Sequence, residues 1–223
     1  MKVNEIFSSI DGEGIRTGYL VTFIRTFGCS LRCSYCDTMY SCEQQENETA
    51  YKEMTIPEII KQCEFLKNKR ITFTGGEPLI QKGAYELVET LIKSDYEVNI
   101  ETNGAHLIKD YVQMRNVDAS KLIITMDWKS PYSQMEKKML TNNLRFLRAN
   151  DVLKFVVANR EDLDAMKRVL EGNKLFCNVF VSPVFGQIEG QEIIQYLKEN
   201  DLQNVRVQVQ LHKIFWDPQK RGV

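Results

Sequence analysis

The chain alternates short apolar runs with longer amphipathic stretches, and this alternation restricts the fold more than any other feature of its 223 residues. The early runs are continuously apolar, as in strands that are buried on both faces of a parallel sheet. The expected strands are Tyr19–Thr26, Arg70–Thr74, Glu97–Glu101, Lys121–Met126, Val152–Val157, Phe176–Ser182 and Val205–Gln210. The expected helices are Ile56–Lys67, Gly83–Ser94, Ser133–Ala149, Arg160–Leu170 and Glu189–Glu199. Thr55 and Pro57 supply an N-cap and a first-turn proline for the first of these helices.

Strand–helix alternation of this kind implies parallel βα units in one domain, here residues 1–223. A closed eight-fold βα barrel takes about 250 residues. This chain is shorter and its strand count is nearer six, so we expect an α/β fold that forms an open, partial βα barrel. The polar stretch Glu43–Lys52 predicts a loop or mobile insert, which either covers a site or is simply solvated.

Composition excludes several classes of protein. The formal net charge is -1 and the pI is near 6.2, so no bulk attraction to nucleic acid or anionic membrane is expected. Met1 to Gly14 does not have the basic start and apolar core of a signal peptide. The longest apolar runs, such as Leu20 to Ile24, are too short to cross a bilayer. We therefore expect a cytoplasmic chain without nucleic-acid or membrane partners.

Three of the six cysteines, Cys29, Cys33 and Cys36, lie in one segment just after the first long strand. Thiolates are the preferred ligands of iron–sulfur clusters, and spacings of three and two residues let three sulfurs reach three corners of a cubane. The fourth iron could then take an amino and a carboxylate group, which S-adenosylmethionine offers. The alternatives are a redox-sensing thiol group and a zinc site with Cys42 as fourth ligand. Structural zinc sites usually pair ligands from two segments, and no second Cys/His pair is present, so Cys42 is expected to be no ligand.

Polar residues follow the next strands where each apolar run stops. The three segments are Thr74-Gly75-Gly76-Glu77-Pro78, Glu101-Thr102-Asn103-Gly104 and Asp127-Trp128-Lys129. The carboxyl ends of parallel strands form the ligand-binding rim of βα folds. Paired glycines let backbone approach a ligand closely, and a glutamate can accept hydrogen bonds from an ammonium group. One such segment is usually a turn or a cap, but their combination with the cysteines predicts a ligand site.

These motifs resemble the radical S-adenosylmethionine superfamily. Within it, further segments over essentially the whole chain are similar to the 7-carboxy-7-deazaguanine synthase family. They are Glu5-Ile6-Phe7 with Ile10-Asp11-Gly12-Glu13-Gly14, the run Phe23 to Cys29, Cys36-Asp37-Thr38, and the tail from Gln210-Leu211-His212-Lys213 to Lys220-Arg221-Gly222-Val223.

The resemblance implies a carbon–nitrogen lyase that converts 6-carboxytetrahydropterin to 7-carboxy-7-deazaguanine with loss of ammonia, on the route to queuosine and related deazapurines. The implied cofactors are a [4Fe-4S] cluster, S-adenosylmethionine as the source of an adenosyl radical, and Mg²⁺. The implied partners are the pterin substrate, an external electron donor such as flavodoxin or ferredoxin, and a second copy of the chain in a homodimer.

Site residues follow from the same motif match. Residues expected to bind the substrate are Ile10, Asp11, Gly12, Glu13, Arg25, Thr74, His212 and the terminal carboxylate of Val223. Residues expected to bind S-adenosylmethionine are Gly75, Gly76, Glu77, Glu101, Asn103, Asp127, Trp128 and Lys129. Thr38 would bind magnesium, for which a hydroxyl is a suitable hard oxygen ligand. Independently of the resemblance, the planar fork of Arg25 suits a carboxylate.

Two departures from the family pattern stand out. The family has glutamine where this chain has Asp11, and an ionised carboxylate cannot donate a hydrogen bond, so the pterin contact there must differ. The family often has Ser-Pro-Lys where this chain has Asp127, Trp128 and Lys129, which keeps only the lysine.

Two other functions remain open on sequence alone. A glycyl-radical activating enzyme shares the cysteine spacing but acts on a protein partner. A non-catalytic iron–sulfur or zinc protein would not bind S-adenosylmethionine.

Overall fold

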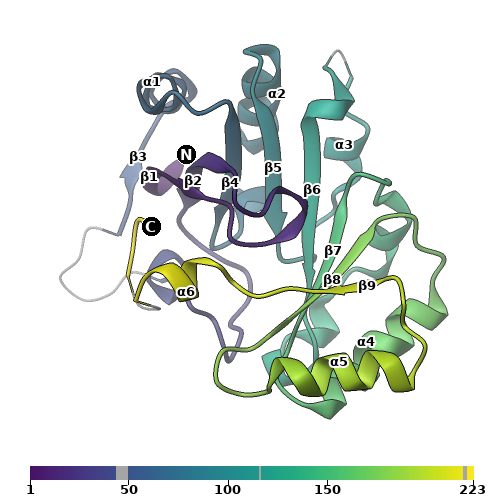
Figure 1. Cartoon of the computed structure of the whole chain (residues 1–223). Helices are drawn as coiled ribbons and strands as arrows, with labels where there is room; N and C mark the ends of the chain where they lie inside the picture. Colours follow the sequence, from purple (N-terminus) through teal and green to yellow (C-terminus); the bar gives the residue numbers. More distant parts are fainter. Residues whose placement is uncertain (44–49, 116, 218–219) are drawn as a thin grey trace.

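One curved sheet organises the protein (Figure 1). The computed structural model describes residues 1–43, 50–115, 117–217 and 220–223. Within this part of the chain the sheet has nine strands, in the order β3-β1-β2-β4-β5-β6-β7-β8-β9. Their bounds are β1 Lys2–Ile10, β2 Leu20–Thr26, β3 Lys52–Glu53, β4 Arg70–Gly75, β5 Glu97–Thr102, β6 Leu122–Trp128, β7 Val152–Val157, β8 Asn178–Pro183 and β9 Val205–Val207.

The strands from β2 through β9 in this order are all parallel, which confirms the open, partial βα barrel. Among the described residues the parallel strands number seven, where about six were expected. β1 was not expected and extends the sheet on the other side of β2. It pairs antiparallel with β2, so that Phe7 lies opposite Phe23, and the short β3 pairs with it in turn. The polar residues Asn4, Glu5 and Ser8 interrupt the apolar pattern of β1, because this strand is only partly buried.

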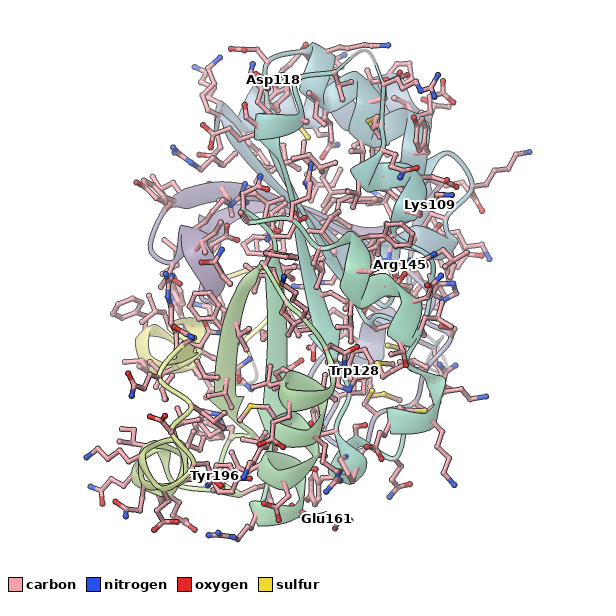
Figure 2. The ribbon with its side chains drawn as sticks, turned by 90° about the vertical axis from the view of Figure 1, so that its right-hand side faces the viewer. Lys109, Asp118, Trp128, Arg145, Glu161 and Tyr196 are labelled. Carbon is pink, nitrogen blue, oxygen red and sulfur yellow. The ribbon has the colours of Figure 1, made fainter. Side chains whose placement is uncertain are left out.

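In the described part of the chain, four longer helices pack on the outside of the sheet (Figures 1 and 2). Their bounds are α1 Ile56–Leu66, α2 Ala84–Lys93, α4 Arg160–Gly172 and α5 Gly190–Glu199, and the short helices are α3 Lys109–Val112 and α6 His212–Phe215. The expected start of α1 is confirmed, since Thr55 and Glu58 form a capping box and Pro57 lies in the first turn. In Figure 2, Glu161 and Tyr196 mark α4 and α5, which lie side by side over the last strands.

The prediction of a helix at Ser133–Ala149 was wrong. The segment instead contains short 3₁₀ turns at Pro131–Ser133, Glu136–Lys138 and Thr141–Phe146. Gln134 has a left-handed backbone, with φ of 62°, which ends any helix there. The buried Asn143 donates to the carbonyls of Gly104 and His106 and accepts from the amide of Ile108. These tertiary bonds stabilise the irregular path over the helical one.

The two faces of the parallel strands differ, and this contrast places the site. Residues such as Phe73, Ile100 and Phe155 point outward into the apolar core beneath the helices. Alternate positions point inward, and on the strands β4 to β8 they are largely polar. They include Thr72, Thr74, Asn99, Glu101, Thr125, Asp127, Lys154 and Ser182. The inner face therefore lines a polar cavity rather than a second apolar core.

No helix among the described residues combines the length and the apolar character needed to span a membrane.

Candidate active site

A pocket of about 660 Å³ lies on the inner face of the sheet, at the carboxyl ends of the parallel strands. It brings together most of the residues that the sequence predicted. Those lining it are Ile10, Gly12, Glu13, Arg25, Cys29, Cys33, Cys36, Thr38, Thr74, Gly75, Gly76, Glu101, Asn103, Asp127, Lys129, His212 and Val223. Asp11, Glu77 and Trp128 are not among them. The expected cover at Glu43–Lys52 falls largely on residues 44–49, which lie outside the described residues.

The cysteine loop follows β2 and presents three half-buried thiols to the pocket. The amide of Leu31 and the side-chain amide of Asn103 point at Cys29 Sγ, at 3.4 and 3.6 Å. Hydrogen bonding with the thiol of Cys42, whose Sγ lies 4.0 Å away, is the largest influence that lowers the pKa of Cys36, to about 6. Burial raises the pKa of Cys33 to about 11. Donors aimed at Cys29 and the Cys42 thiol beside Cys36 thus favour the thiolate, which is the form that binds iron.

These thiols suit a cluster better than a single ion. Among the described residues, no group of three His, Cys, Asp or Glu side chains is arranged to hold one metal ion. A tetrahedral zinc site would require such a group, with sulfurs about 2.3 Å from the metal. A cubane instead spreads its ligands over separate irons. The donor set of three thiols with hydrogen-bond donors aimed at sulfur fits that arrangement.

Gly75 and Gly76 are needed for a reason other than the expected one. A Cβ on Gly75 would overlap the backbone of Thr26, and a Cβ on Gly76 would overlap the carbonyl of Gly28. The amide of Gly76 donates to Thr26 O at 3.1 Å, and the amide of Glu77 donates to Gly28 O at 2.8 Å. The two glycines therefore let β4 approach the backbone that leads into the cysteine loop. They also line the pocket, so contact with a ligand there stays a prediction.

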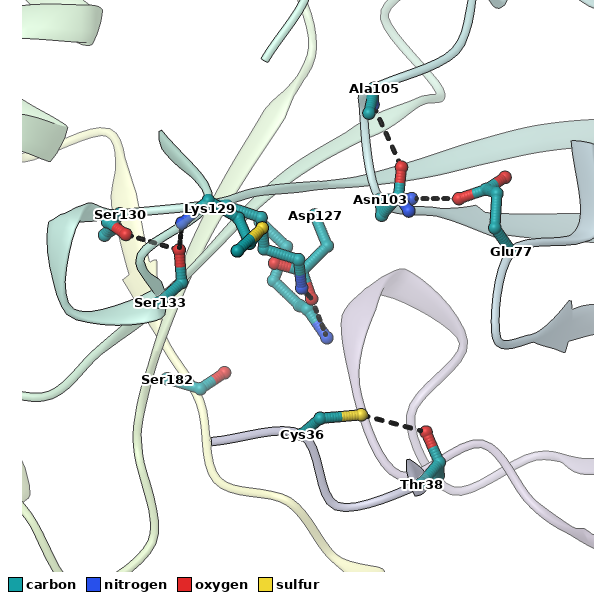
Figure 3. A network of polar contacts seen from close by, with 12 residues as sticks. Cys36, Thr38, Glu77, Asn103, Ala105, Asp127, Lys129, Ser130, Ser133 and Ser182 are labelled. Atoms are coloured by element: carbon teal, nitrogen blue, oxygen red, sulfur yellow. Dashed lines mark hydrogen bonds and ion pairs between the residues drawn. The ribbon is translucent and has the colours of Figure 1, made fainter. Parts of the chain in front are cut away.

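Glu77 is fully buried beneath this contact. Its carboxylate accepts the amide of Asn103 at 2.8 Å (Figure 3). It also accepts the hydroxyl of Thr102 at 2.9 Å and the amide of Leu79 at 3.0 Å. Burial raises the pKa of Glu77 to about 7. Glu77 thus joins the ends of β4 and β5, and it orients Asn103 rather than offering its carboxylate to the pocket.

Asp11 likewise lies away from the pocket. Its carboxylate pairs with Arg16 at 2.7 Å and accepts the hydroxyl of Thr72 at 2.7 Å. Arg16 in turn donates to the carbonyls of Ile71 and Glu97. Asp11, which replaces the family glutamine, is therefore paired with a buried arginine. Together Asp11 and Arg16 attach the turn between β1 and β2 to the strands β4 and β5. Trp128 is also buried, in the apolar core.

The opposite wall of the pocket carries a chain of alternating charges. Glu13 pairs with Lys154 at 3.1 Å, Lys154 lies 3.5 Å from Asp127, and Asp127 pairs with Lys129 at 3.1 Å. Burial would raise the pKa of Glu13, but Lys154 and hydrogen bonds from Gln210 and Ser182 outweigh it and lower the pKa. The same carboxylates raise the pKa of Lys154 against its own burial. Glu13, Lys129 and Lys154 therefore remain charged at neutral pH.

Lys154 is the main residue that the sequence analysis missed. It lies in the middle of β7, flanked by apolar residues, where a lysine is rare unless paired. A single charge inside an otherwise apolar strand was the available signal. Phe7 and Phe23 were also missed as pocket residues, and their rings stack with centroids 5.0 Å apart.

The start and the tail of the chain both border the pocket. In Figure 1 the tail runs from β9 toward α6. The amide of Leu211 donates to Gly12 O at 3.2 Å, and that of Gly14 donates to Gln208 Oε1 at 2.7 Å. His212 lies so near Gly12 that a Cβ there would be 2.8 Å from its Nδ1. His212, the first residue of the short helix α6, therefore lies against Gly12, and the terminal Val223 lines the same pocket.

Arg25 reaches the pocket from β2 and is oriented by its neighbours. Its Nε donates to Glu5 at 2.7 Å, and the hydroxyl of Tyr40 donates to the same carboxylate oxygen at 3.0 Å. In the tail, the guanidinium of Arg221 lies 4.1 Å from the Tyr40 ring centroid. The pair with Glu5 uses one edge of the guanidinium, and Arg25 still borders the pocket.

Some buried polar atoms in the site have no partner in the described part of the chain. They include Asp127 Oδ1 and the hydroxyl of Tyr35, both from pocket residues, and the hydroxyl of the neighbouring Ser130. Buried polar atoms are normally satisfied, so such atoms in a pocket suit a polar ligand.

Comparisons with known proteins agree with this geometry. The Radical SAM superfamily model matches residues 23–145, which contain the cysteine loop and the ends of β4, β5 and β6. A protein of Clostridium acetobutylicum named 7-carboxy-7-deazaguanine synthase is 43% identical, over 100% of this chain and 99% of its own length. A protein of the same name from Methanospirillum hungatei is 36% identical, over 98% of this chain and 86% of its own length.

Solved structures share the fold. The crystal structure of QueE from Escherichia coli superposes with a TM-score of 0.73 at 21% identity, over 94% of this chain and 93% of that one. Streptococcus suis SuiB bound to S-adenosylmethionine gives a TM-score of 0.57 at 15% identity, over 85% of this chain and 49% of that one. At these identities the structures establish the partial barrel and nothing finer.

Proposed function

Because the chain belongs to the 7-carboxy-7-deazaguanine synthase family of the radical S-adenosylmethionine superfamily, we propose that it converts 6-carboxytetrahydropterin to 7-carboxy-7-deazaguanine. The reaction contracts the pterin ring with loss of ammonia, which makes the protein a carbon–nitrogen lyase. The observation that carries the proposal is the single pocket that joins the cysteine loop to Glu13, Arg25, His212 and Val223. Such a pocket accommodates a small, planar, anionic substrate beside a radical source.

Cys29, Cys33 and Cys36 would hold a [4Fe-4S] cluster, and S-adenosylmethionine would bind at its open iron. When bound, these two groups supply an electron and a hydrogen-abstracting radical. Asn103 and the amide of Leu31 stabilise negative charge on Cys29. Asp127, with its free Oδ1, would accept a hydrogen bond from S-adenosylmethionine, and Lys129 holds that carboxylate in place.

The substrate would bind along the charged wall. The carboxylate of Glu13 is ionised and can accept N–H groups of the pterin ring, while Lys154 fixes its position. Arg25 would pair with the carboxylate of the substrate, since its guanidinium borders the pocket and is held there by Glu5. The stacked rings of Phe7 and Phe23 give the ring system an apolar face.

Three further parts of the proposal come from the family resemblance. Thr38, whose hydroxyl faces Cys36 Sγ at 3.8 Å, would bind Mg²⁺ from the edge of the pocket (Figure 3). An external donor such as flavodoxin or ferredoxin would reduce the cluster, and the enzyme would act as a homodimer. Chelation of Mg²⁺ should lower kcat/KM without changing iron content, and the mass measured by light scattering tests the dimer.

The deciding experiment is anaerobic. The reconstituted chain is given dithionite, S-adenosylmethionine, Mg²⁺ and 6-carboxytetrahydropterin, and 7-carboxy-7-deazaguanine is sought by mass spectrometry. We expect the product with the native chain and none with Cys33→Ala. Deoxyadenosine without 7-carboxy-7-deazaguanine would support the radical chemistry and refute the proposed substrate. That is the result expected of a glycyl-radical activating enzyme. An intact cluster with neither product would refute the enzymatic function.

A further inference from the structure

Cys42 is a fourth thiol of the pocket for which the three-cysteine motif has no use. It is buried, with 7% of its surface exposed, and it lines the pocket beside the other three. Its Sγ lies 4.0 Å from Cys36 Sγ and 3.6 Å from the carbonyl oxygen of Thr38. Cys63 and Cys177 lie elsewhere and do not border the pocket.

The backbone holds this thiol in place. A 3₁₀ turn at Met39–Ser41 ends at Cys42, whose amide donates to Met39 O at 2.9 Å. The turn is attached to β2 because the amide of Gly28 donates to Ser41 O at 2.7 Å. Both ends of the cysteine loop are therefore joined, and the Cys42 side chain points at the sulfur of Cys36 rather than into solvent.

The contacts of Cys42 are those of a protonated thiol. A carbonyl oxygen such as Thr38 O accepts hydrogen bonds and repels a thiolate. A cysteine that binds iron must be deprotonated. The single S–H of Cys42 has two acceptors within reach, Thr38 O at 3.6 Å and Cys36 Sγ at 4.0 Å. Cys36 occupies a ligand position of the motif, and as a thiolate it is the stronger acceptor of the two.

Resting on the proposed function, we propose that Cys42 donates its S–H to the Cys36 thiolate of the bound cluster and thereby raises the reduction potential of the cluster. Hydrogen bonds to the sulfurs are one of the factors that set this potential, because reduction adds negative charge that the thiolates share. Cys29 already receives donors from Leu31 and Asn103. Cys42 gives Cys36 the corresponding donor, so two of the three ligands are stabilised in the reduced state. Cys42 thus acts through Cys36, as a positioning and tuning residue.

The test measures the potential and not the activity. The full chain is reconstituted, and the reduced cluster is titrated by EPR without S-adenosylmethionine or substrate. Cys42→Val fills the space without a donor, Cys42→Ala leaves the space empty, and Cys42→Ser keeps a donor. Cys63→Ala, at a buried thiol outside the pocket, is the matched control.

We expect Cys42→Val and Cys42→Ala to lower the ratio of reduced to oxidised cluster, at the native midpoint, by threefold to tenfold. That is a shift of about 30 to 60 mV for a one-electron couple. Cys42→Ser should stay nearer the native value than either, and Cys63→Ala should not move it. Iron and sulfide content and the EPR line shape should be unchanged in all four variants.

Two results would overturn the inference. An unmoved midpoint in Cys42→Val or Cys42→Ala would show that Cys42 donates nothing to the cluster. Loss of iron or a new EPR line shape in both would make Cys42 a ligand instead. A native chain that takes up no cluster would refute the proposed function as well, so the two failures are distinguishable.

Discussion

The two sides of the pocket are built in different ways. On the cluster side, backbone packs on backbone: Gly75 and Gly76 lie against Thr26 and Gly28, and buried Glu77 accepts two amides. On the opposite wall, charged side chains from distant segments hold one another, as Glu13, Lys154 and Asp127 do. The cluster side should therefore tolerate a change of charge better than added volume, and the charged wall should show the reverse.

The largest expected effect is added volume on the cluster side. In Gly76→Ala the new Cβ meets the Gly28 carbonyl, so the loop must move, at a cost of about 3 kcal/mol. We expect cluster content, measured as iron per chain, to fall by more than half and activity to fall with it. Gly190→Ala, where a Cβ meets nothing within 4 Å, should leave both unchanged. A fully loaded, active Gly76→Ala would refute the packing argument.

Removal of a charge from the opposite wall should have the second-largest effect. Lys154→Met leaves Glu13 and Asp127 without their shared cation, and breaking a buried pair costs about 3 kcal/mol of stability. We expect kcat/KM to fall about 100-fold while iron content stays native, which separates this wall from the cluster.

The matched control is Lys93→Met, which breaks only an exposed pair with Glu89 and should change nothing measurable. Adding Glu13→Gln to Lys154→Met should recover part of the stability, since it removes an unpaired charge, but not the activity. Native kcat/KM in Lys154→Met would contradict the role given to the charged wall.

A change of charge on the cluster side should have a smaller effect, seen mainly in pH dependence. Burial raises the pKa of Glu77 to about 7, above the ordinary value of 4.5 that applies when the chain is unfolded. The folded state therefore binds the proton more tightly, and the contribution of Glu77 to stability falls as pH rises from 4.5 through 7.

Between pH 5.5 and 7.5 the native free energy of unfolding should lose about 2 kcal/mol relative to Glu77→Gln, which cannot titrate. Urea unfolding of the cluster-free chains at both pH values measures this difference. Parallel pH profiles for the two chains would show that Glu77 is ionised in the folded state throughout that range.

The smallest expected effect is added volume on the charged wall. In Gly12→Ala the Cβ lies 2.8 Å from His212 Nδ1, the end of a side chain that can move. We expect KM for the substrate to rise about tenfold, or about 1.4 kcal/mol, with native cluster content. In Gly12→Ala/His212→Ala the penalty of the glycine change should disappear, and strict additivity would contradict a contact between the two residues.

The cluster side was the more predictable of the two. The cysteine loop and the Gly-Gly-Glu-Pro segment are each a short continuous motif. Each follows a parallel strand, so both must lie at the same rim of the sheet. Even so, the roles of these residues differ from those expected. The glycines make room for the neighbouring backbone, and Glu77 joins the ends of two strands. Local spacing and strand order were enough to predict which residues lie at this side of the pocket, but not what each of them contacts.

The charged wall could be predicted only in part. Motif resemblance supplied Glu13, Arg25 and His212, but not Lys154, because pairing between β7 and the segment after β1 is a contact over 141 positions. Asp11 was expected at the substrate, and only the structure shows it paired with Arg16. Arg16 is only five positions away in sequence, but the carbonyls of Ile71 and Glu97 that hold its guanidinium beside Asp11 reach it only through folding.

By itself the sequence determined the parallel βα order, the helix start at Thr55 and the chemistry of the three-cysteine loop. Those follow from periodicity, capping and spacing, which act over a few neighbouring residues. The tertiary structure decided that β1 joins the sheet, that Ser133–Ala149 forms no α-helix, and that Cys42 faces Cys36. Each of these depends on hydrogen bonds or packing that form only once separate segments have been brought together by folding.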